Sequence, residues 1–493
     1  MRVLFVTNGF PPSEIGGTEV LARNVGRRFV DDGDEVIIFA PAYSPQQEKD
    51  SLVEGMRIHR VPVPGGKIYS FTYLDGTVDL KFAHFLLDAK PEVAIVWHTI
   101  NLSTRILEVL NRVGVPYVLF LNDFHFLCDQ THLVTAAMQP CDGPEDGTKC
   151  KDCIAVTVSK FIDREEGDPA QLGRLRVSTM RRLLGFANTL VAPSDFVKEK
   201  YVDFGLNVET ISVVSSGVDV KSIRAKFKPV ASDRLRFGYF GGNSERRGIS
   251  DVLEAFHSIK DPSIELVLAG QYLNEIPPKD LPAKTRIIGR YLPEDVGQAL
   301  SEIDVLLIPS RCHESYSLLA REAAAVGVPI IVSDLRAQSD ALQNGVNGLC
   351  FKAGEPTDLA AKVLLLKYDA KLLQSLKKHD SGARSVEQSA TELRNMCRDL
   401  VRRNEVTTGE IGRRFSLFLN ECIDRIVEEQ RLEAADELNR TRRELLAIQD
   451  SFGYRVMQFY ASRIDRLLPE GTRRGEFRKV VTTRLRRSRT QSS

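Results

Sequence analysis

The chain has 493 residues, of which 43% are hydrophobic and 27% charged, and 67 Lys and Arg side chains nearly balance 66 Asp and Glu for a formal net charge of +1. This composition excludes wholesale disorder and fibrous repeats, and the length predicts two or three domains of roughly 100–200 residues each. The near-neutral charge argues against a protein that is basic throughout and coats nucleic acid.

The chain opens on an apolar run at 3–6, which is followed by Pro11 and Pro12. That run is too short for the core of a signal peptide, and no run in the sequence approaches the roughly 20 apolar residues that cross a bilayer. We therefore expect a first buried strand and a cytoplasmic protein, in which cysteines stay reduced.

Short β-branched runs alternate with helical segments in two series, which begin with the strands expected at 3–7 and 236–240. Such alternation predicts parallel sheets with helices on both faces. We expect an α/β protein with two doubly wound, Rossmann-like domains at 1–226 and 227–402, a cleft between them and a connection at 226–234. The other expected strands are 34–40, 93–98, 115–122, 264–269, 286–288, 305–308 and 329–333. The expected helices are 19–32, 103–113, 249–259, 293–303, 317–326 and a last helix at 386–401.

Gly16 and Gly17 stand in the loop between the first expected strand and the first expected helix. Ligands of open α/β sheets bind beyond the carboxyl ends of the strands, where paired glycines let the backbone approach a phosphate or a sugar closely. A bare loop is the alternative. The loop is not a Gly-x-Gly-x-x-Gly fingerprint and the sequence has no Walker A motif, which argues against dehydrogenases and P-loop NTPases.

Four of the eight cysteines cluster in a Gly-, Pro- and Asp-rich insert at 128–153, as Cys128, Cys141, Cys150 and Cys153. The last two form a Cys-x-x-Cys pair with the spacing of a metal site, and a structural zinc ion held by four thiolates is the natural candidate. Four reduced thiols without a metal are the alternative.

The first strand of the second series runs into a loop with Gly241 and Gly242, followed by Arg246 and Arg247. Two guanidinium groups on a Gly-rich loop above the edge of a sheet suit a diphosphate, because arginine offers paired hydrogen-bond donors. A solvated turn with surface arginines is the alternative.

Glu314 and Glu322 form the third motif, which is stronger evidence than the Gly-Gly loop at 16–17 or the arginine loop at 241–247. If the chain between them were helical throughout, eight residues would separate them by ~12 Å. This span suits a diphosphate-linked ligand with a hydroxylated ring at each end, because carboxylates accept hydrogen bonds from hydroxyl groups. Free backbone N–H groups near 315–318 would then face the phosphates between the rings. Two glutamates at this spacing on a helix also occur by chance.

The composition changes beyond residue 402. Residues 403–450 are densely charged and predict a long helix or helical hairpin, in which 411–450 is a candidate for self-association despite an interrupted heptad pattern. The tail at 451–493 holds 11 Lys and Arg against 3 Asp and Glu, a net charge of +8 that leaves −7 on residues 1–450. Its interleaved apolar residues suit an anionic membrane surface, with a solvated basic tail as the alternative. Nucleic acid is not an expected partner.

Together the three motifs resemble those of the family 4 glycosyltransferases, the retaining group with the GT-B fold. The Gly-Gly loop of that family falls at Gly16 and Gly17, and its Glu-x7-Glu motif falls at Glu314 and Glu322. The resemblance covers about residues 1–402, and a subset of bacterial members carries a similar Cys-rich insert. Segments that support it, in the order of the family, are 193–196, 217–219, 309–310, 327–329 and 344–348. The helix at 386–401 resembles the last helix of the family, which crosses back to the first domain.

The sequence departs from the family pattern at two places. Gly242 stands where the family often has Arg, and Arg247 stands where it has Lys, so Arg247 keeps the charge at the phosphates. Asn122 stands where many relatives have a histidine at the end of a strand. His98 and His125 are nearby candidates for the role of that histidine, and a structural role is the alternative.

The resemblance implies a metal-independent, hexosyltransferase-type enzyme that needs no cofactor for catalysis. The second domain would hold most of a nucleotide-diphosphate sugar and the first domain the acceptor, with front-face attack and deprotonation of the acceptor hydroxyl by the leaving diphosphate. The residues implied in catalysis are Glu314, Arg247 and His98. Those implied in donor binding are Gly16, Gly17, Gly241, Gly242, Arg246, Arg247, Glu314, Ser315, Tyr316, Ser317, Leu318 and Glu322.

We expect the acceptor to be a lipid-linked or cell-surface polysaccharide, met by a cytoplasmic enzyme that is peripheral on the inner face of the plasma membrane. One alternative is a nucleotide-sugar epimerase on the same fold. The other is an inactive scaffold that acts through the C-terminal helices, which Gly242 and Asn122 encourage. The Glu-x7-Glu region and the Gly-Gly loop favour transfer.

Overall fold

The computed structural model describes most of the chain up to residue 404. The described residues are 1–11, 16–44, 47, 50–62, 76–161, 168–336, 342–377, 383–404, 414 and 417, with 157–161 described by their backbone alone. Residues Met1–Leu419 form one compact unit, within which the described strands build two sheets. The expected helical segment at 403–450, apart from 403, 404, 414 and 417, and the basic tail at 451–493 lie outside the described residues.

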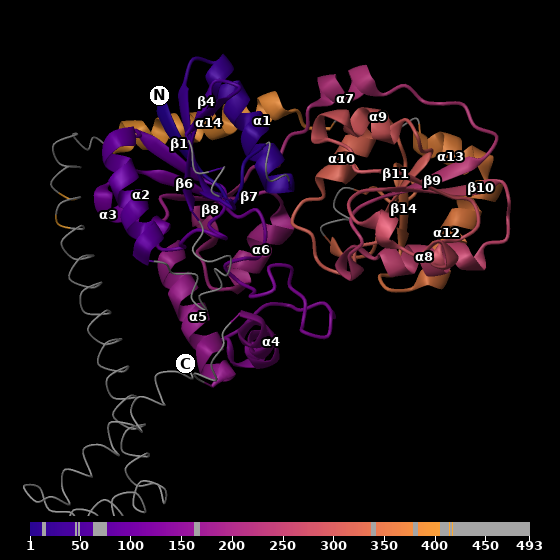
Figure 1. The fold of residues 1–493 in the computed structure, drawn as a ribbon, viewed down its shortest axis with the longest axis horizontal. Helices are drawn as coiled ribbons and strands as arrows, with labels where there is room; N and C mark the ends of the chain where they lie inside the picture. The colour runs from indigo at the N-terminus through magenta and orange to yellow at the C-terminus, as the bar shows by residue number, and fades with distance from the viewer. Residues whose placement is uncertain are drawn as a thin grey trace, which may run out of the picture. The chain divides into compact units, whose positions relative to one another are not determined.

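The first sheet has eight strands in the order β3-β4-β2-β1-β5-β6-β7-β8, and β3 alone among them runs antiparallel to its neighbour (Figure 1). The inner strands are apolar and buried along their whole length, which is the pattern of a parallel sheet covered on both faces. The strands are β1 (Arg2–Val6), β2 (Glu35–Ala42), β3 (Ser51–Val53), β4 (Met56–Pro62), β5 (Val93–Val96), β6 (Tyr117–Phe120), β7 (Thr189–Ala192) and β8 (Ile211–Val213). The helices of this half are α1 (Gly17–Asp31), α2 (Gly76–Ala89), α3 (Ile106–Val113), α4 (Lys151–Phe161), α5 (Pro169–Leu184) and α6 (Asp195–Asp203).

The second sheet has six parallel strands in the order β11-β10-β9-β12-β13-β14. Two apolar clusters, one on each face, hold its helices against it. The strands are β9 (Leu235–Phe240), β10 (Ile264–Ala269), β11 (Thr285–Gly289), β12 (Val305–Ile308), β13 (Ile330–Ser333) and β14 (Gly348–Phe351). The helices are α7 (Val220–Lys226), α8 (Ile249–Ser258), α9 (Val296–Leu300), α10 (Leu318–Ala325), α12 (Pro356–Tyr368) and α13 (Ala370–Lys377).

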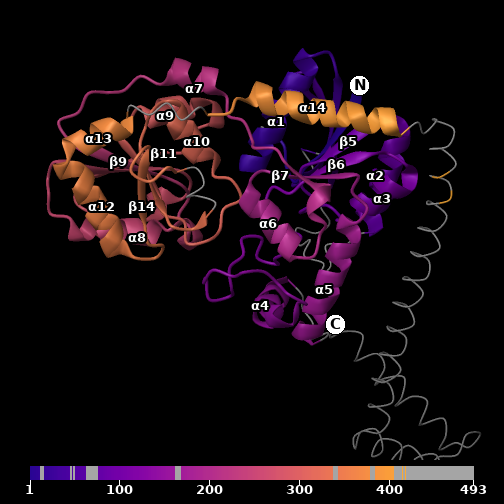
Figure 2. The same ribbon diagram turned by 180° about the vertical axis from the view of Figure 1, so that it is seen from behind.

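The last described helix, α14 (Val386–Arg403), returns to the first sheet. Ser385 and Gln388 form a capping box that satisfies backbone N–H groups at its start. Leu393 and Cys397 on its apolar face are buried in the core beneath β1, and Arg394 forms an ion pair with Asp34. Figure 2 shows the helix, in orange, lying along the N-terminal half beside α1.

The two sheets confirm the expected α/β fold with two Rossmann-like halves. The helix expected at 293–303 is wrong in extent, because a 3-10 turn at Pro293–Asp295 precedes a short α9. The domain boundary at residues 226 and 227 stays a prediction; Ile223 of α7, just before it, packs in the core of the second sheet. In the described part of the chain, no helix has the length and apolar character to cross a membrane.

Candidate active site

A pocket of about 830 Å³ lies at the carboxyl ends of strands from both sheets. Asn122 and Asp123, just after β6, line it from the first sheet, and Gly241 and Ser310, just after β9 and β12, line it from the second. Ligands of open α/β sheets bind at this end of the strands. The volume lies within the range of about 300–1,000 Å³ that is usual for small-molecule sites.

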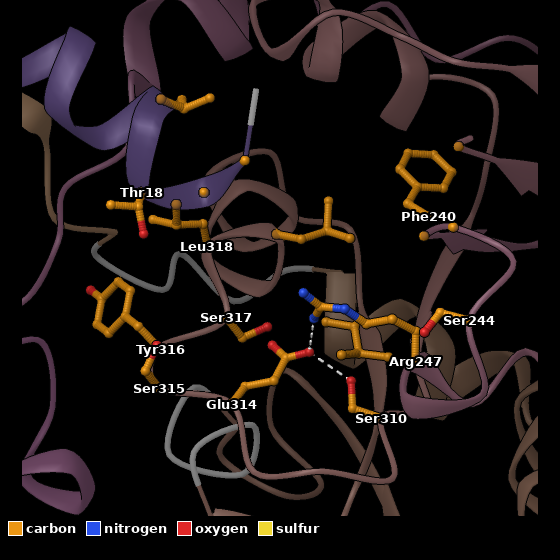
Figure 3. Close-up of a pocket in the computed structure, with 18 of the residues that line it drawn as sticks. Thr18, Phe240, Ser244, Arg247, Ser310, Glu314, Ser315, Tyr316, Ser317 and Leu318 are labelled. Carbon is orange, nitrogen blue, oxygen red and sulfur yellow. Dashed lines mark hydrogen bonds and ion pairs between the residues drawn. The ribbon is translucent and has the colours of Figure 1, made fainter. Parts of the chain in front are cut away.

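Glu314 and Arg247 form an ion pair on the wall that the second sheet contributes (Figure 3). Ser310 donates a hydrogen bond of 2.6 Å to the same carboxylate oxygen of Glu314. Burial alone would raise the pKa of Glu314, but the charge of Arg247 and the hydrogen bonds from Ser310 and Ser317 outweigh it and lower that pKa. Glu314 is therefore an ionised carboxylate at neutral pH.

The chain between the two motif glutamates is not helical throughout, which corrects the assumption behind the ~12 Å separation. The helix α10 begins only at Leu318, and Ser317 before it has a left-handed backbone with φ of +50°. Glu314 therefore lies on a loop, and Glu322 lies little more than one turn into the helix. Ser315 at the centre of this loop accepts a 2.8 Å hydrogen bond from the Ser194 hydroxyl on its carbonyl oxygen.

Glu322 lines the pocket with a carboxylate that has no ion-pair partner among the described residues. Burial raises its pKa to about 7, and its charge is one of the causes that raise the pKa of the neighbouring Tyr291. The two motif glutamates therefore differ at neutral pH, because Glu314 is fully ionised and Glu322 is close to half protonated.

Two glycines of the second-sheet wall are required by close backbone contacts. A Cβ on Gly270, where φ is +142°, would lie 1.8 Å from the carbonyl oxygen of Gly241. A Cβ on Gly248, where φ is +73°, would lie 1.9 Å from the carbonyl oxygen of Pro309. These positions admit no side chain, which keeps the loops after β9, β10 and β12 in contact. A Cβ on Gly242 would meet nothing nearer than the Gln271 carbonyl oxygen at 3.7 Å.

The pocket contains all but two of the residues that the sequence implied for catalysis and donor binding. Those that line it are Gly16, Gly17, Gly241, Gly242, Arg247, Glu314, Ser315, Tyr316, Ser317, Leu318 and Glu322. Arg246 is not among the lining residues; its guanidinium lies 3.1 Å from the Nδ1 atom of His132, which does line the pocket. His98 is not among them either, and its side chain is 5% exposed.

His98 lies behind Asp123, a pocket residue that the sequence reasoning did not select. The Nε2 atom of His98 is 3.0 Å from a carboxylate oxygen of Asp123, and the His125 N–H donates to the other at 2.7 Å. Burial raises the pKa of Asp123, but the charge and hydrogen bond of His98 outweigh it and bring that pKa to about 2. The sequence did hold a signal for Asp123, because this residue directly follows Asn122, which stands where many relatives have a histidine.

Thr131, His132 and Arg290 are among the other pocket residues that the sequence did not indicate. The first two belong to the Cys-rich insert, so this insert contributes directly to the pocket wall. Arg290 follows β11 at the carboxyl edge of the second sheet, which is the edge where ligands of such sheets bind. Thr131 and His132 stand outside the cysteine motif of the insert, and a single arginine forms no motif.

The four cysteines of the insert lie near one another. The backbone N–H of Cys141 donates to the carbonyl oxygen of Leu133 at 2.8 Å. The Cys153 sulfur lies 3.9 Å from the carbonyl oxygen of Val134. Burial, with a smaller effect of the neighbouring thiols, raises the pKa of Cys150 to about 12 and that of Cys153 to about 11. In the described part of the chain, no group of three or more His, Cys, Asp or Glu side chains is arranged to hold a metal ion. The zinc site therefore stays a prediction.

Elemental analysis tests the zinc prediction. A metal must displace the thiol protons to bind, so a bound zinc would appear as one metal ion per chain that is released at acid pH. The double substitution Cys150→Ser, Cys153→Ser should then lose the metal, whereas Cys350→Ser, which lies outside the insert, should keep it. A purified wild-type chain with no metal would contradict the prediction.

Two family models match adjacent parts of the chain: Glycosyltransferase Family 4 over residues 15–222 and Glycosyl transferases group 1 over residues 222–381. Among curated relatives, the glycogen synthase of Mycobacterium tuberculosis is 27% identical over 387 residues, which are 74% of this chain and 85% of that protein. The amylovoran biosynthesis glycosyltransferase AmsK of Erwinia amylovora is 25% identical over 193 residues, so the match spans 36% of this chain and about half (47%) of that relative.

A third relative is the N,N'-diacetylbacillosaminyl-diphospho-undecaprenol alpha-1,3-N-acetylgalactosaminyltransferase of Campylobacter jejuni, 25% identical over 45% of this chain and 62% of that protein. Among solved structures, the sucrose-phosphate synthase of Thermosynechococcus elongatus aligns with a TM-score of 0.62 at 16% identity, over 81% of this chain and 98% of that one. Anabaena HepE in complex with UDP and glucose aligns with a TM-score of 0.57 at 14% identity, over 80% and 99%. These likenesses confirm the GT-B fold expected from the sequence.

Proposed function

The chain belongs to the family 4 glycosyltransferases, and from this membership we propose that it transfers a hexose-type sugar, with retention, from a nucleotide-diphosphate sugar to a polysaccharide or lipid-linked glycan. The observation that carries the proposal is the ion pair of Arg247 with Glu314 in a pocket that Glu322 also lines. Arg247 and these two carboxylates match a ligand with a diphosphate between two hydroxylated rings. The amylovoran and diphospho-undecaprenol enzymes among the relatives support the class of acceptor.

In this proposal the pocket residues act mainly by electrostatics. Arg247 and the backbone N–H groups at the start of α10 stabilise the charge that grows on the departing phosphate. The bond from the sugar carbon to the phosphate oxygen breaks as the bond to the acceptor oxygen forms, and the acceptor proton passes to the leaving diphosphate. Glu314 holds the transferred sugar through its hydroxyl groups, and Glu322 holds the ribose. No metal or other cofactor takes part in this scheme.

We also keep as a proposal that the enzyme works at the inner face of the plasma membrane. The +8 charge of residues 451–493 supports it, since anionic lipids attract such a segment.

A screen of nucleotide sugars tests the proposed function. A donor that binds the folded state raises the unfolding temperature, by an amount that grows with its concentration over Kd. The stabilising compound is then tested for hydrolysis and for transfer to glycolipid acceptors. Stabilisation with no turnover under any condition would favour the inactive scaffold, and conversion of one nucleotide sugar into an epimer would favour the epimerase.

Donor binding should depend on pH through Glu322. The free carboxyl group has a pKa of about 7, raised by burial, and hydrogen bonds from ribose hydroxyl groups favour its charged form. Binding should therefore release a proton between about pH 6 and 7, and affinity for the nucleotide sugar should rise with pH through this window and level off above it. We expect a rise of about tenfold, since one pKa unit corresponds to a factor of ten.

Calorimetry in buffers of different ionisation enthalpy measures this proton release. The intact nucleotide sugar is the right ligand, because its diphosphate is a diester that does not titrate near neutral pH. Glu322→Gln should remove the pH dependence, whereas the exposed Glu355→Gln should keep it. An affinity that is flat between pH 5.5 and 8 would contradict the assignment of Glu322 to the ribose.

A further inference from the structure

Asp123 is the one carboxylate that the described part of the first half presents to the pocket. It follows β6 at the carboxyl edge of the first sheet, whereas Arg247, Glu314 and Glu322 all come from the second half. Its side chain is 33% exposed although its surroundings are buried. A partly buried carboxylate needs hydrogen-bond partners, so the bonds that the protein makes to Asp123 show which of its acceptor sites are left for a ligand.

The protein occupies only part of the hydrogen-bonding capacity of this carboxylate. One oxygen accepts the N–H of His125 at 2.7 Å, and the other lies 3.0 Å from Nε2 of His98. An ionised carboxylate has about four acceptor sites, so about two remain for a ligand that enters the pocket. They can only accept hydrogen bonds, because a carboxyl group with a pKa near 2 carries no proton at neutral pH.

Contacts behind Asp123 hold it in one orientation. The backbone N–H of Ile100 donates to Nδ1 of His98 at 2.9 Å, so that Nε2 carries the ring hydrogen that faces Asp123. The Tyr201 hydroxyl donates to the Asp123 carbonyl oxygen at 2.8 Å and fixes the backbone of the same residue. His98 itself does not line the pocket, so it acts on a ligand only through Asp123.

We propose that Asp123 is the acceptor-binding carboxylate of the pocket, which accepts hydrogen bonds from hydroxyl groups of the acceptor sugar, and that His98 is the positioning residue that holds it. The ligand chemistry is that of a polyol, because an acceptor-only group with two free sites selects neighbouring hydroxyl groups. The proposal rests on the proposed function and adds the wall of the pocket that meets the acceptor. It also moves His98 from the catalytic role that the resemblance implied to a supporting one.

The substitution Asp123→Asn tests the contact, with Asp142→Asn in an exposed part of the insert as the matched control. We expect Asp123→Asn to lower kcat/KM for the acceptor by about 10- to 100-fold, the range for losing hydrogen bonds to a charged group. Affinity for the nucleotide sugar, and its slow hydrolysis without acceptor, should stay within about twofold of wild type. Asp142→Asn should match wild type in every measurement, and the unfolding temperatures of both variants confirm that they fold.

Two results would overturn the proposal. An unchanged kcat/KM for the acceptor in a folded Asp123→Asn protein would show that the carboxylate touches no substrate. An equal loss of nucleotide-sugar affinity and of hydrolysis would place its contact on the donor sugar instead. If wild-type protein neither binds nor turns over any nucleotide sugar, the proposed function fails, and that outcome is distinct from both.

A pair of variants at His98 tests the positioning role. His98→Leu removes the N–H that faces Asp123 and should raise KM for the acceptor by about tenfold, with donor affinity unchanged. His98→Gln can restore an N–H donor toward Asp123 and should recover most of that loss. Equal defects in both variants, with both folded, would reject the positioning role. A purely structural effect would not depend on whether residue 98 carries an N–H group that faces Asp123.

Discussion

Replacing Glu314 by Gln is expected to lower sugar transfer by at least about 100-fold, the loss that follows when one charge-stabilising contact of a transition state is removed. The substitution keeps the shape of the side chain but removes its charge. The hydroxyl groups of the transferred sugar then lose a charged hydrogen-bond acceptor. Glu314 and Arg247 form an ion pair in the pocket, so the carboxylate also competes with a phosphate for the guanidinium.

The same substitution should therefore leave affinity for the nucleoside diphosphate unchanged or raise it a fewfold. Initial-rate assays measure the transfer, and calorimetry with UDP and GDP measures the affinity. Glu275→Gln, on an exposed 3-10 turn outside the pocket, is the matched control and should behave like wild type. Near-normal turnover by a folded Glu314→Gln protein would remove this residue from the site, and a fall in diphosphate affinity would contradict the competition.

Replacing Arg247 by Ala is expected to weaken nucleoside-diphosphate binding by about 10- to 100-fold, because charge-assisted hydrogen bonds to phosphate are lost. The charge of Glu314 is the main cause that raises the pKa of Arg247 above its ordinary value, so the guanidinium is charged at every working pH. With Arg247 absent, Glu314 also becomes an unpaired negative charge beside the phosphate site. Transfer should fall further than binding, because the charge on the leaving group grows in the transition state.

Arg246→Ala is the matched control for Arg247→Ala. The two arginines are adjacent in sequence and equal in charge, but Arg246 reaches toward His132 and does not line the pocket. Its loss should change diphosphate affinity by less than about threefold at physiological salt, where salt screens a charge that makes no direct contact with the phosphates. Equal losses in the two variants would mean that the loop binds phosphate through its overall charge.

The sequence was most informative where strands are buried on both faces. The strands β10 and β12 agree to the residue with those expected at 264–269 and 305–308, because a covered parallel strand is a continuous apolar run with polar or Gly residues at its ends. Helices were harder, and α2, α5 and α12 were not predicted. An amphipathic helix leaves only a periodic signal, which Gly, Pro and charged inserts interrupt. The end of the Cys-rich insert at 153 falls inside α4, which packs on α5, and only the tertiary structure shows this contact.

For the site, the sequence by itself determined which loops would meet. Residues after parallel strands gather at one edge of a sheet, so the Gly-Gly loop, the loop after β9 and the Glu314 loop were expected together, and all three line the pocket. The tertiary structure alone decided which side chains of those loops face the pocket. It places Arg247 on the pocket wall and Arg246 against the side chain of His132, and it places Asp123 in front of His98. Side-chain direction depends on what packs behind each residue, here His132 and Ile100, and no spacing along the chain encodes those neighbours.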